Sequence, residues 1–119
     1  MLLVIIHHHF RPGGVRRVIE LATPQVVAHA PAPLREIVLA TGEAPEATWL
    51  DRLRQSLPGL LVRVLVIPAF GYASEQELHG RDLRKVVTDG IRKLREEIRG
   101  RACLIWAHNL SLGRNFYLT

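Results

Sequence analysis

Four short apolar runs recur along the chain, and they constrain its fold more than any other feature of the sequence. They cover residues 2–8, 36–41, 60–67 and 102–107, and most of their members are leucine or β-branched. Runs of this length and composition are typical of strands that are buried on both faces of a parallel sheet. The sequence therefore predicts four parallel strands.

Segments with helical periodicity separate these runs. Between the first two, apolar residues fall on one helical face: Val15, Val18, Ile19, Ala22 and Val26. Pro24 lies within this segment and is expected to interrupt or bend the helix, because proline lacks the N–H that the helix needs. A second helix is predicted from a first turn at Pro45 to Pro58, and a third over residues 83–98.

The alternation of strands and helices predicts βαβ units with right-handed crossovers. We expect a Rossmann-like, doubly wound α/β fold of three layers, with about four strands in the order 3-2-1-4. The 119 residues, 48% of them apolar, suffice for one domain without an internal boundary. Because the polar segment 108–115 opens a further helix just before Thr119, we expect residues 1–119 to be an incomplete domain of a longer polypeptide.

Composition narrows the class of protein. The formal charge is +5, but acids are interleaved with the bases and no aromatic residues accompany them, so we expect no nucleic-acid partner. The single cysteine, Cys103, fits a reducing compartment and predicts a cytoplasmic protein. The opening run lacks a basic segment and ends well before the roughly 20 apolar residues of a membrane span.

Ligands of doubly wound sheets bind at the carboxyl ends of the strands, where the strand order reverses. Two loops qualify by this criterion: residues 9–14 after the first strand and residues 108–115 after the fourth. In the order 3-2-1-4 these two strands are neighbours. We therefore expect the two loops to lie side by side and to form the site.

The pair Gly13-Gly14 stands where the first strand turns into the first helix. Glycine lets the backbone approach a ligand closely, and the N–H groups that begin a helix favour a phosphate, to which Arg11 and Arg16 would add charge. A tight turn that only requires a positive φ explains the pair equally well. The segment lacks the dinucleotide fingerprint, and Glu43 alone is weak support for a ribose-binding acid, so a nicotinamide enzyme is disfavoured.

Histidines cluster at the same strand end. His7, His8 and His9 are expected to alternate sides of a strand, so the three cannot share one ion and no metal site is predicted. His9 is expected to line the mouth of the loop. His108 and Asn109 follow the fourth strand, where polar residues face the ligand, although they could also cap a helix that begins near Ser111.

Two segments resemble a known family. A hydrophobic strand followed by His-Phe-Arg-Pro-Gly-Gly-Val-Arg-Arg-Val-Ile-Glu, residues 9–20, resembles the glycine-rich loop and first helix of retaining GT-B glycosyltransferases, specifically the family 4-like N-terminal domain. The segment 104–109 followed by Asn115 is similar to the strand-end histidine segment of the same domain. The order of elements agrees with that family along the whole chain, whereas the proline-rich residues 30–33 replace the usual glycine-containing turn.

The resemblance implies a transferase with two Rossmann-like domains that uses a nucleotide-sugar as co-substrate and needs no other cofactor. Gly13 and Gly14, with Arg11 and Arg16, would approach the donor diphosphate. His9, His108, Asn109 and Asn115 would line the acceptor side of the cleft, where a glycan, lipid or small molecule binds. The donor-binding C-terminal domain is not in this chain, so we expect the chain alone to be inactive; the catalytic residues are unassigned, and peripheral membrane association is compatible with this class.

The alternative is a small flavodoxin-like or receiver-like module that binds or regulates without catalysis. A receiver would carry acids at the end of the first strand, where this chain carries histidines. A flavin-binding module would be coloured after purification.

Overall fold

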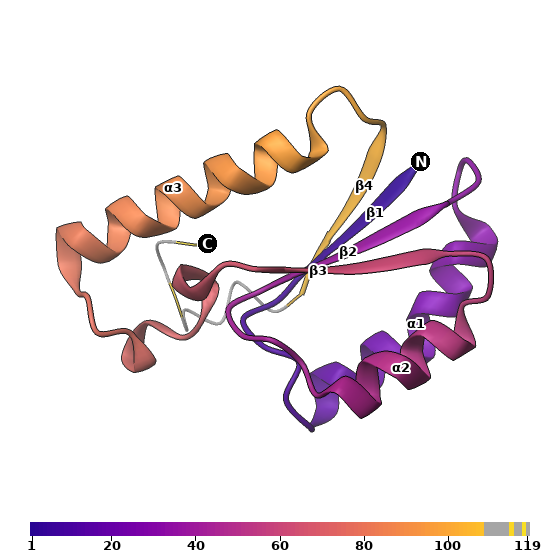
Figure 1. Ribbon diagram of the computed structural model, residues 1–119, viewed down its shortest axis with the longest axis horizontal. Coiled ribbons are helices and arrows are strands. Elements are labelled where there is room, and N and C mark those ends of the chain that lie inside the picture. Colours follow the sequence, from indigo (N-terminus) through magenta and orange to yellow (C-terminus); the bar gives the residue numbers. More distant parts are fainter. Residues whose placement is uncertain (109–114, 116–117, 119) are drawn as a thin grey trace.

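The computed structural model describes residues 1–108, Asn115 and Leu118. Its centre is a parallel sheet of β1 (Leu2–Ile6), β2 (Glu36–Thr41), β3 (Leu61–Val66) and β4 (Cys103–Ala107), in the order β3-β2-β1-β4 (Figure 1). The predicted strand order is confirmed. Each strand lies within one of the four apolar runs. As expected, β1 and β2 are buried on both faces, whereas the edge strands β3 and β4 are partly exposed, for example at Leu61 and Ile105.

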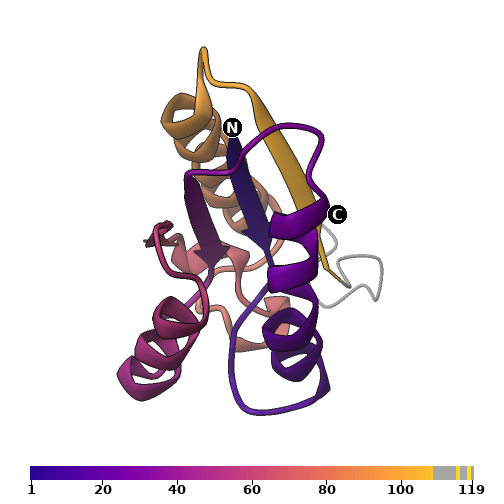
Figure 2. The same cartoon turned by 90° about the vertical axis from the view of Figure 1, so that its right-hand side faces the viewer.

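Helices cover both faces of this sheet. Three α-helices, α1 (Gly14–His29), α2 (Ala47–Ser56) and α3 (Gly80–Ile98), connect the strands in turn, and two short 3-10 helices, η1 (Pro68–Phe70) and η2 (Ala73–Glu75), lie between β3 and α3. Helices α1 and α2 lie on one face and α3 lies on the other (Figures 1 and 2). The described residues thus form the predicted three-layer, Rossmann-like α/β arrangement.

The alternation of side chains along β1 divides the interior into two cores. Leu3 and Ile5 belong to the core under α1 and α2, whereas Leu2 and Val4 belong to the core under α3. All four side chains are at most 1% exposed. Two separate apolar cores therefore hold the helical layers against the strands from opposite sides.

Helix α3 approaches the sheet most closely at Gly90. A Cβ atom placed there would lie 2.5 Å from Cγ2 of Ile67 and 3.2 Å from Cε1 of Phe70. Both neighbours are buried, Phe70 completely. Glycine at this position therefore sets the spacing between α3 and the end of β3.

Replacing Gly90 by alanine is expected to destabilise the protein by up to about 2 kcal/mol, because overpacking costs about 1–3 kcal/mol and alanine returns roughly 1 kcal/mol of helix propensity. Urea unfolding followed by circular dichroism measures the effect. The exposed Lys85→Ala on the same helix is the control and should stay within about 0.5 kcal/mol of the parent. Equal stability of both variants and the parent would show that α3 can move away from the sheet freely.

Three predicted details of the elements are wrong. Pro24 does not interrupt the first helix: α1 is continuous through it, and Ile19 and Thr23, both fully buried, anchor the helix to the core just before the proline. Strand β1 ends at Ile6 rather than at His8. At the second helix, Pro45 precedes the N-cap residue Glu46 instead of forming the first turn.

Candidate functional site

The loops that follow β1, β2 and β3 are joined by backbone hydrogen bonds at the carboxyl edge of the sheet. The N–H of Gly42 donates to the carbonyl of His8 at 2.9 Å, and the N–H of Ile67 donates to the carbonyl of Thr41 at 2.8 Å. A Cβ atom on Gly42 would lie 2.6 Å from Cα of Gly71 and 2.9 Å from the His8 oxygen. Only glycine allows the three loops to come this close.

A cavity of about 460 Å³ lies between these loops, and we call it the polar cavity. Its lining includes His8, His9, Arg11, Glu43, Glu75 and Gln76. These residues come from three different loops that are far apart in the sequence. The cavity therefore lies at the edge where doubly wound sheets bind their ligands.

Arg11 joins two of the three loops by ion pairs. Its Nε donates to Oε1 of Glu43 at 2.5 Å, and its Nη2 donates to Oε2 of Glu75 at 2.9 Å. The hydrogen bonds that Arg11 donates to Glu75 and Glu43 raise the pKa of Arg11, and its hydrogen bond to Glu75 lowers the pKa of that carboxyl. With two carboxylates on one guanidinium, Arg11 is not the unpaired cation expected beside a phosphate.

The histidine triplet is clustered, contrary to the expectation that a strand would disperse it. The ring centroid of His7 lies 5.4 Å from the ring centroid of His8 and equally far from that of His9. It lies 6.0 Å from the ring centroid of His108. The triplet clusters because β1 ends at Ile6 and the chain then leaves the strand conformation. No group of three or more His, Cys, Asp or Glu within residues 1–108, at Asn115 or at Leu118 could hold a metal ion.

His7 and His8 are buried and each bonds a backbone carbonyl. Nδ1 of His7 donates to the His108 oxygen at 2.7 Å, and Nδ1 of His8 donates to the Phe70 oxygen at 2.8 Å. Burial lowers the pKa of His7 to about 4, with a further lowering from the neighbouring histidines. Nε2 of His8 has no hydrogen-bond partner in the described part of the chain, although the side chain is only 1% exposed.

His9 lines the polar cavity. Its Nδ1 accepts the N–H of Arg11 at 3.2 Å, so its Nε2 carries the proton and donates to the hydroxyl oxygen of Tyr72 at 3.0 Å. Burial and the charge of Arg11 lower the pKa of His9. The neutral ring therefore connects the loop after β1 to the loop after β3.

The glycine pair begins α1. Gly13 has a φ of 152°, which side chains rarely adopt, and Cβ atoms on Gly13 or Gly14 would meet nothing within 4 Å. No side chain caps this helix start, and its first turn carries no acid. The N–H groups of the first turn are therefore open to an anion.

Arg16 points from the first turn of α1 toward α2. Its Nη1 donates to Oε1 of Glu46 at 2.9 Å, and its guanidinium lies 5.6 Å from the centroid of the Trp49 ring. Glu20, four residues further on, adds a second carboxylate at 3.9 Å. Arg16 thus fixes α1 to α2, and its charge is already compensated.

The loops after β1 and β4 begin side by side, as the strand order requires. The N–H of His108 donates to the Ile6 carbonyl at 2.9 Å. Asn109 lies outside the described residues. Asn115 is completely buried, and its Nδ2 donates to the carbonyls of Ala69 and Gly71 at 2.8 Å each, which holds the loop after β3 in place.

Glu75 is the main site residue that sequence reasoning missed. It lies in the longest irregular stretch of the chain, residues 67–79, and no spacing marks it. Glu75 could have been expected at the site from its position alone. The carboxyl ends of parallel strands meet at one edge of the sheet, and this stretch follows β3 just as the glycine loop follows β1.

Comparison of the chain with protein-family models, with curated proteins and with solved structures finds no match. Within the described residues, no helix has the length and apolar character that crossing a membrane requires. The fold and the cavity therefore define the class: a Rossmann-like α/β domain with a polar cavity at the carboxyl ends of its strands.

Proposed function

We propose that this chain is the acceptor-side domain of a retaining GT-B glycosyltransferase, which works with a second domain to transfer a sugar from a nucleotide-sugar to a hydroxyl-bearing acceptor in the cytoplasm. One observation supports this most strongly: the uncapped, glycine-initiated start of α1 follows the same loop that lines the polar cavity. A diphosphate site and an acceptor site are then built on a single loop, residues 7–13.

In this proposal the backbone binds the donor diphosphate. The open N–H groups after Gly13 and Gly14 would stabilise the charge that develops on the departing diphosphate. Arg11 and Arg16 would then orient the loop through their glutamate partners, since both guanidiniums are already paired. His108, which begins its loop beside β1, would face the cleft with Asn109.

The donor role predicts that Gly14→Leu weakens binding of uridine diphosphate at least tenfold. The position has open space and an ordinary φ, so the substitution should fold normally while its side chain covers the N–H groups. Isothermal titration against uridine diphosphate measures the change.

The matched control is Ala28→Leu, which adds the same side chain to an exposed position at the far end of the same helix. It should bind uridine diphosphate like the parent. Equal affinity of the parent and Gly14→Leu would contradict the phosphate role. Sugar transfer by the chain alone would contradict the proposal that the reaction requires a second domain.

A ligand-binding module without catalysis remains the second candidate. The pairing of Arg11 with two glutamates favours it, because such an arrangement is expected where a loop need not bind a diphosphate. Absence of any binding of nucleoside diphosphates and nucleotide-sugars by the folded parent chain would support this candidate over the transferase.

A further inference from the structure

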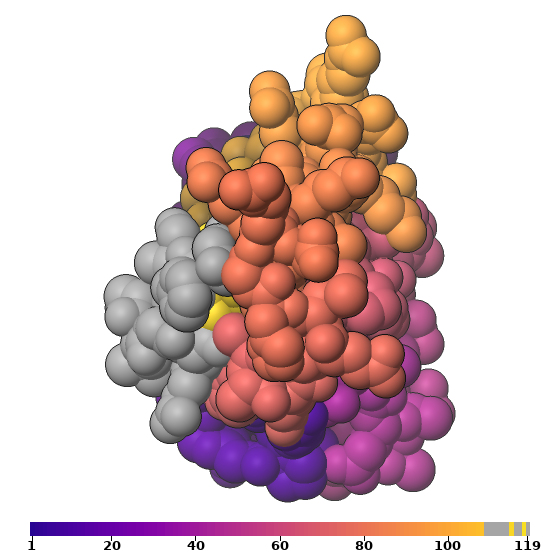
Figure 3. All heavy atoms as spheres, turned by 90° about the vertical axis from the view of Figure 1, so that its left-hand side faces the viewer, coloured from indigo at the N-terminus to yellow at the C-terminus, as the bar shows by residue number. Residues whose placement is uncertain are grey.

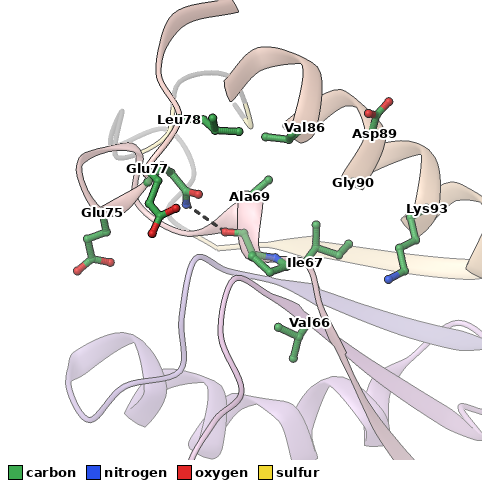
Figure 4. A pocket seen from close by; sticks show the side chains of 12 residues that line it. Val66, Ile67, Ala69, Glu75, Glu77, Leu78, Val86, Asp89, Gly90 and Lys93 are labelled. Atoms are coloured by element: carbon green, nitrogen blue, oxygen red, sulfur yellow. Dashed lines mark hydrogen bonds between the residues drawn. The ribbon is translucent and has the colours of Figure 1, made fainter. Parts of the chain in front are cut away.

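A second cavity lies between the end of β3 and α3, and we call it the apolar cavity. Its volume is about 590 Å³, within the range of small-molecule sites. Ile67 and Ala69 lie on its β3 side, and Leu78 and Val86 point toward each other (Figure 4). Charged residues also line it, namely Glu75, Glu77, Asp89 and Lys93. Leu78 is 44% exposed, so solvent now contacts an apolar side chain that a ligand would cover.

The apolar cavity adjoins the polar cavity. Pro68, Glu75 and Gln76 line both. Nε2 of Gln76 donates to the Pro68 carbonyl at 3.0 Å, which fixes this shared wall (Figure 4). In the space-filling view, the segment after β3 lies directly against the segment after β1 (Figure 3). A ligand that spans the shared wall would therefore contact both cavities.

The charges of the polar cavity indicate which kind of polar group a ligand would place there. Glu43 and Glu75 face one guanidinium, that of Arg11, so the carboxylates outnumber the cation and disfavour a phosphate. Carboxylate oxygens accept hydrogen bonds from hydroxyl groups.

We propose that the two cavities form one site for an amphipathic acceptor, with an uncharged, polyhydroxylated head in the polar cavity and a hydrocarbon chain in the apolar cavity. This inference deepens the proposed function. Only the description of the ligand as an acceptor rests on that function. The binding site itself is defined by the cavities alone.

Three probes test the site by NMR titration of the chain labelled on its methyl groups and amides. n-Octyl β-D-glucopyranoside carries both parts, methyl β-D-glucopyranoside carries the head alone, and n-octyl phosphate carries the same chain on an anionic head. All are used below their micelle concentrations. We expect the octyl glucoside to bind at least fivefold more tightly than either other probe, with shifts at Ile67, Leu78 and Val86. Stronger binding of n-octyl phosphate would overturn the proposal.

A variant pair checks where the hydrocarbon chain lies. Leu78→Asp places a charge in the apolar cavity and should weaken octyl glucoside binding at least fivefold. Leu21→Asp makes the same change at a more exposed leucine, 60% exposed, on α1 and away from both cavities, and should bind like the parent. Unchanged binding by Leu78→Asp, or equal losses in both variants, would show that the chain does not occupy this cavity.

A titration with uridine diphosphate separates this inference from the proposed function. Uridine diphosphate should shift the amides of residues 13–16 and leave the methyl groups of Ile67 and Val86 unchanged. If uridine diphosphate shifts nothing while octyl glucoside binds as expected, the transferase proposal fails and the amphipathic site stands. The reverse result overturns the amphipathic site alone.

Discussion

Replacing Gly42 by alanine is expected to destabilise the protein by about 3 kcal/mol or more, or to prevent folding. The new Cβ would meet the backbone N and Cα of Gly71 and the carbonyl of His8. None of these is a flexible side chain that can turn away. Because the three loops that frame the polar cavity meet here, the fold could relieve the clash only by separating them. Urea unfolding, or the soluble yield if the variant is too unstable, measures the effect.

The control is Gly14→Ala, the same change at a glycine with open space around it and no positive φ. Its stability should lie within about 0.5 kcal/mol of the parent. If Gly42→Ala were as stable as this control, the close contact between the loops after β2 and β3 would not exist in solution.

Acidification from pH 7 to pH 5 is expected to destabilise the protein by about 2 kcal/mol through His7 alone. The folded pKa of about 4 lies below the ordinary value of 6.5, so between these values the unfolded chain binds the proton and the folded chain does not. The contribution of the neutral His7 ring to the stability of the folded protein is complete above pH 6.5 and is lost as the pH falls toward 4. The cause is burial first, since the side chain is 3% exposed, and then the charges of His8, His9 and His108.

Urea midpoints of the parent and of His7→Asn at pH 7 and pH 5 test this expectation. Asparagine can still donate to the His108 carbonyl but does not titrate, so the variant should lose less stability between the two pH values than the parent does. His29→Asn, at an exposed histidine of α1, should keep the full pH dependence. If the parent and both variants lose the same stability between pH 7 and pH 5, folding does not lower the pKa of His7.

The parallel strands and the three layers could be predicted because they depend on local and generic causes, and the order 3-2-1-4 is the one typical of the Rossmann-like class. Each apolar run is long enough for one strand, and the helical segments between them permit only parallel strands with right-handed crossovers. The residues at which helices and strands begin and end were predicted less accurately. Pro24 remains inside α1 because the burial of Ile19 and Thr23 outweighs one missing hydrogen bond, and burial is a property of the assembled layers.

The sequence alone located the site at the carboxyl edge and pointed to Gly13, Gly14 and His9 there. It could not show that Arg11 and Arg16 are neutralised, because Glu75 lies 64 residues from Arg11 and Glu46 lies 30 residues from Arg16. Ion pairs over such separations depend on how the loops pack. This pairing moves the proposed phosphate contact from side chains to the backbone.

For this protein, then, the periodicity of apolar residues determined the parallel strands and the layers, because hydrophobic burial follows local pattern. Only the tertiary structure decided the character of the site. It clustered the histidines, joined Arg11 to Glu43 and Glu75, and placed an apolar cavity beside a polar one. The physical reason is that charge compensation and cavity shape arise between segments that the sequence keeps apart.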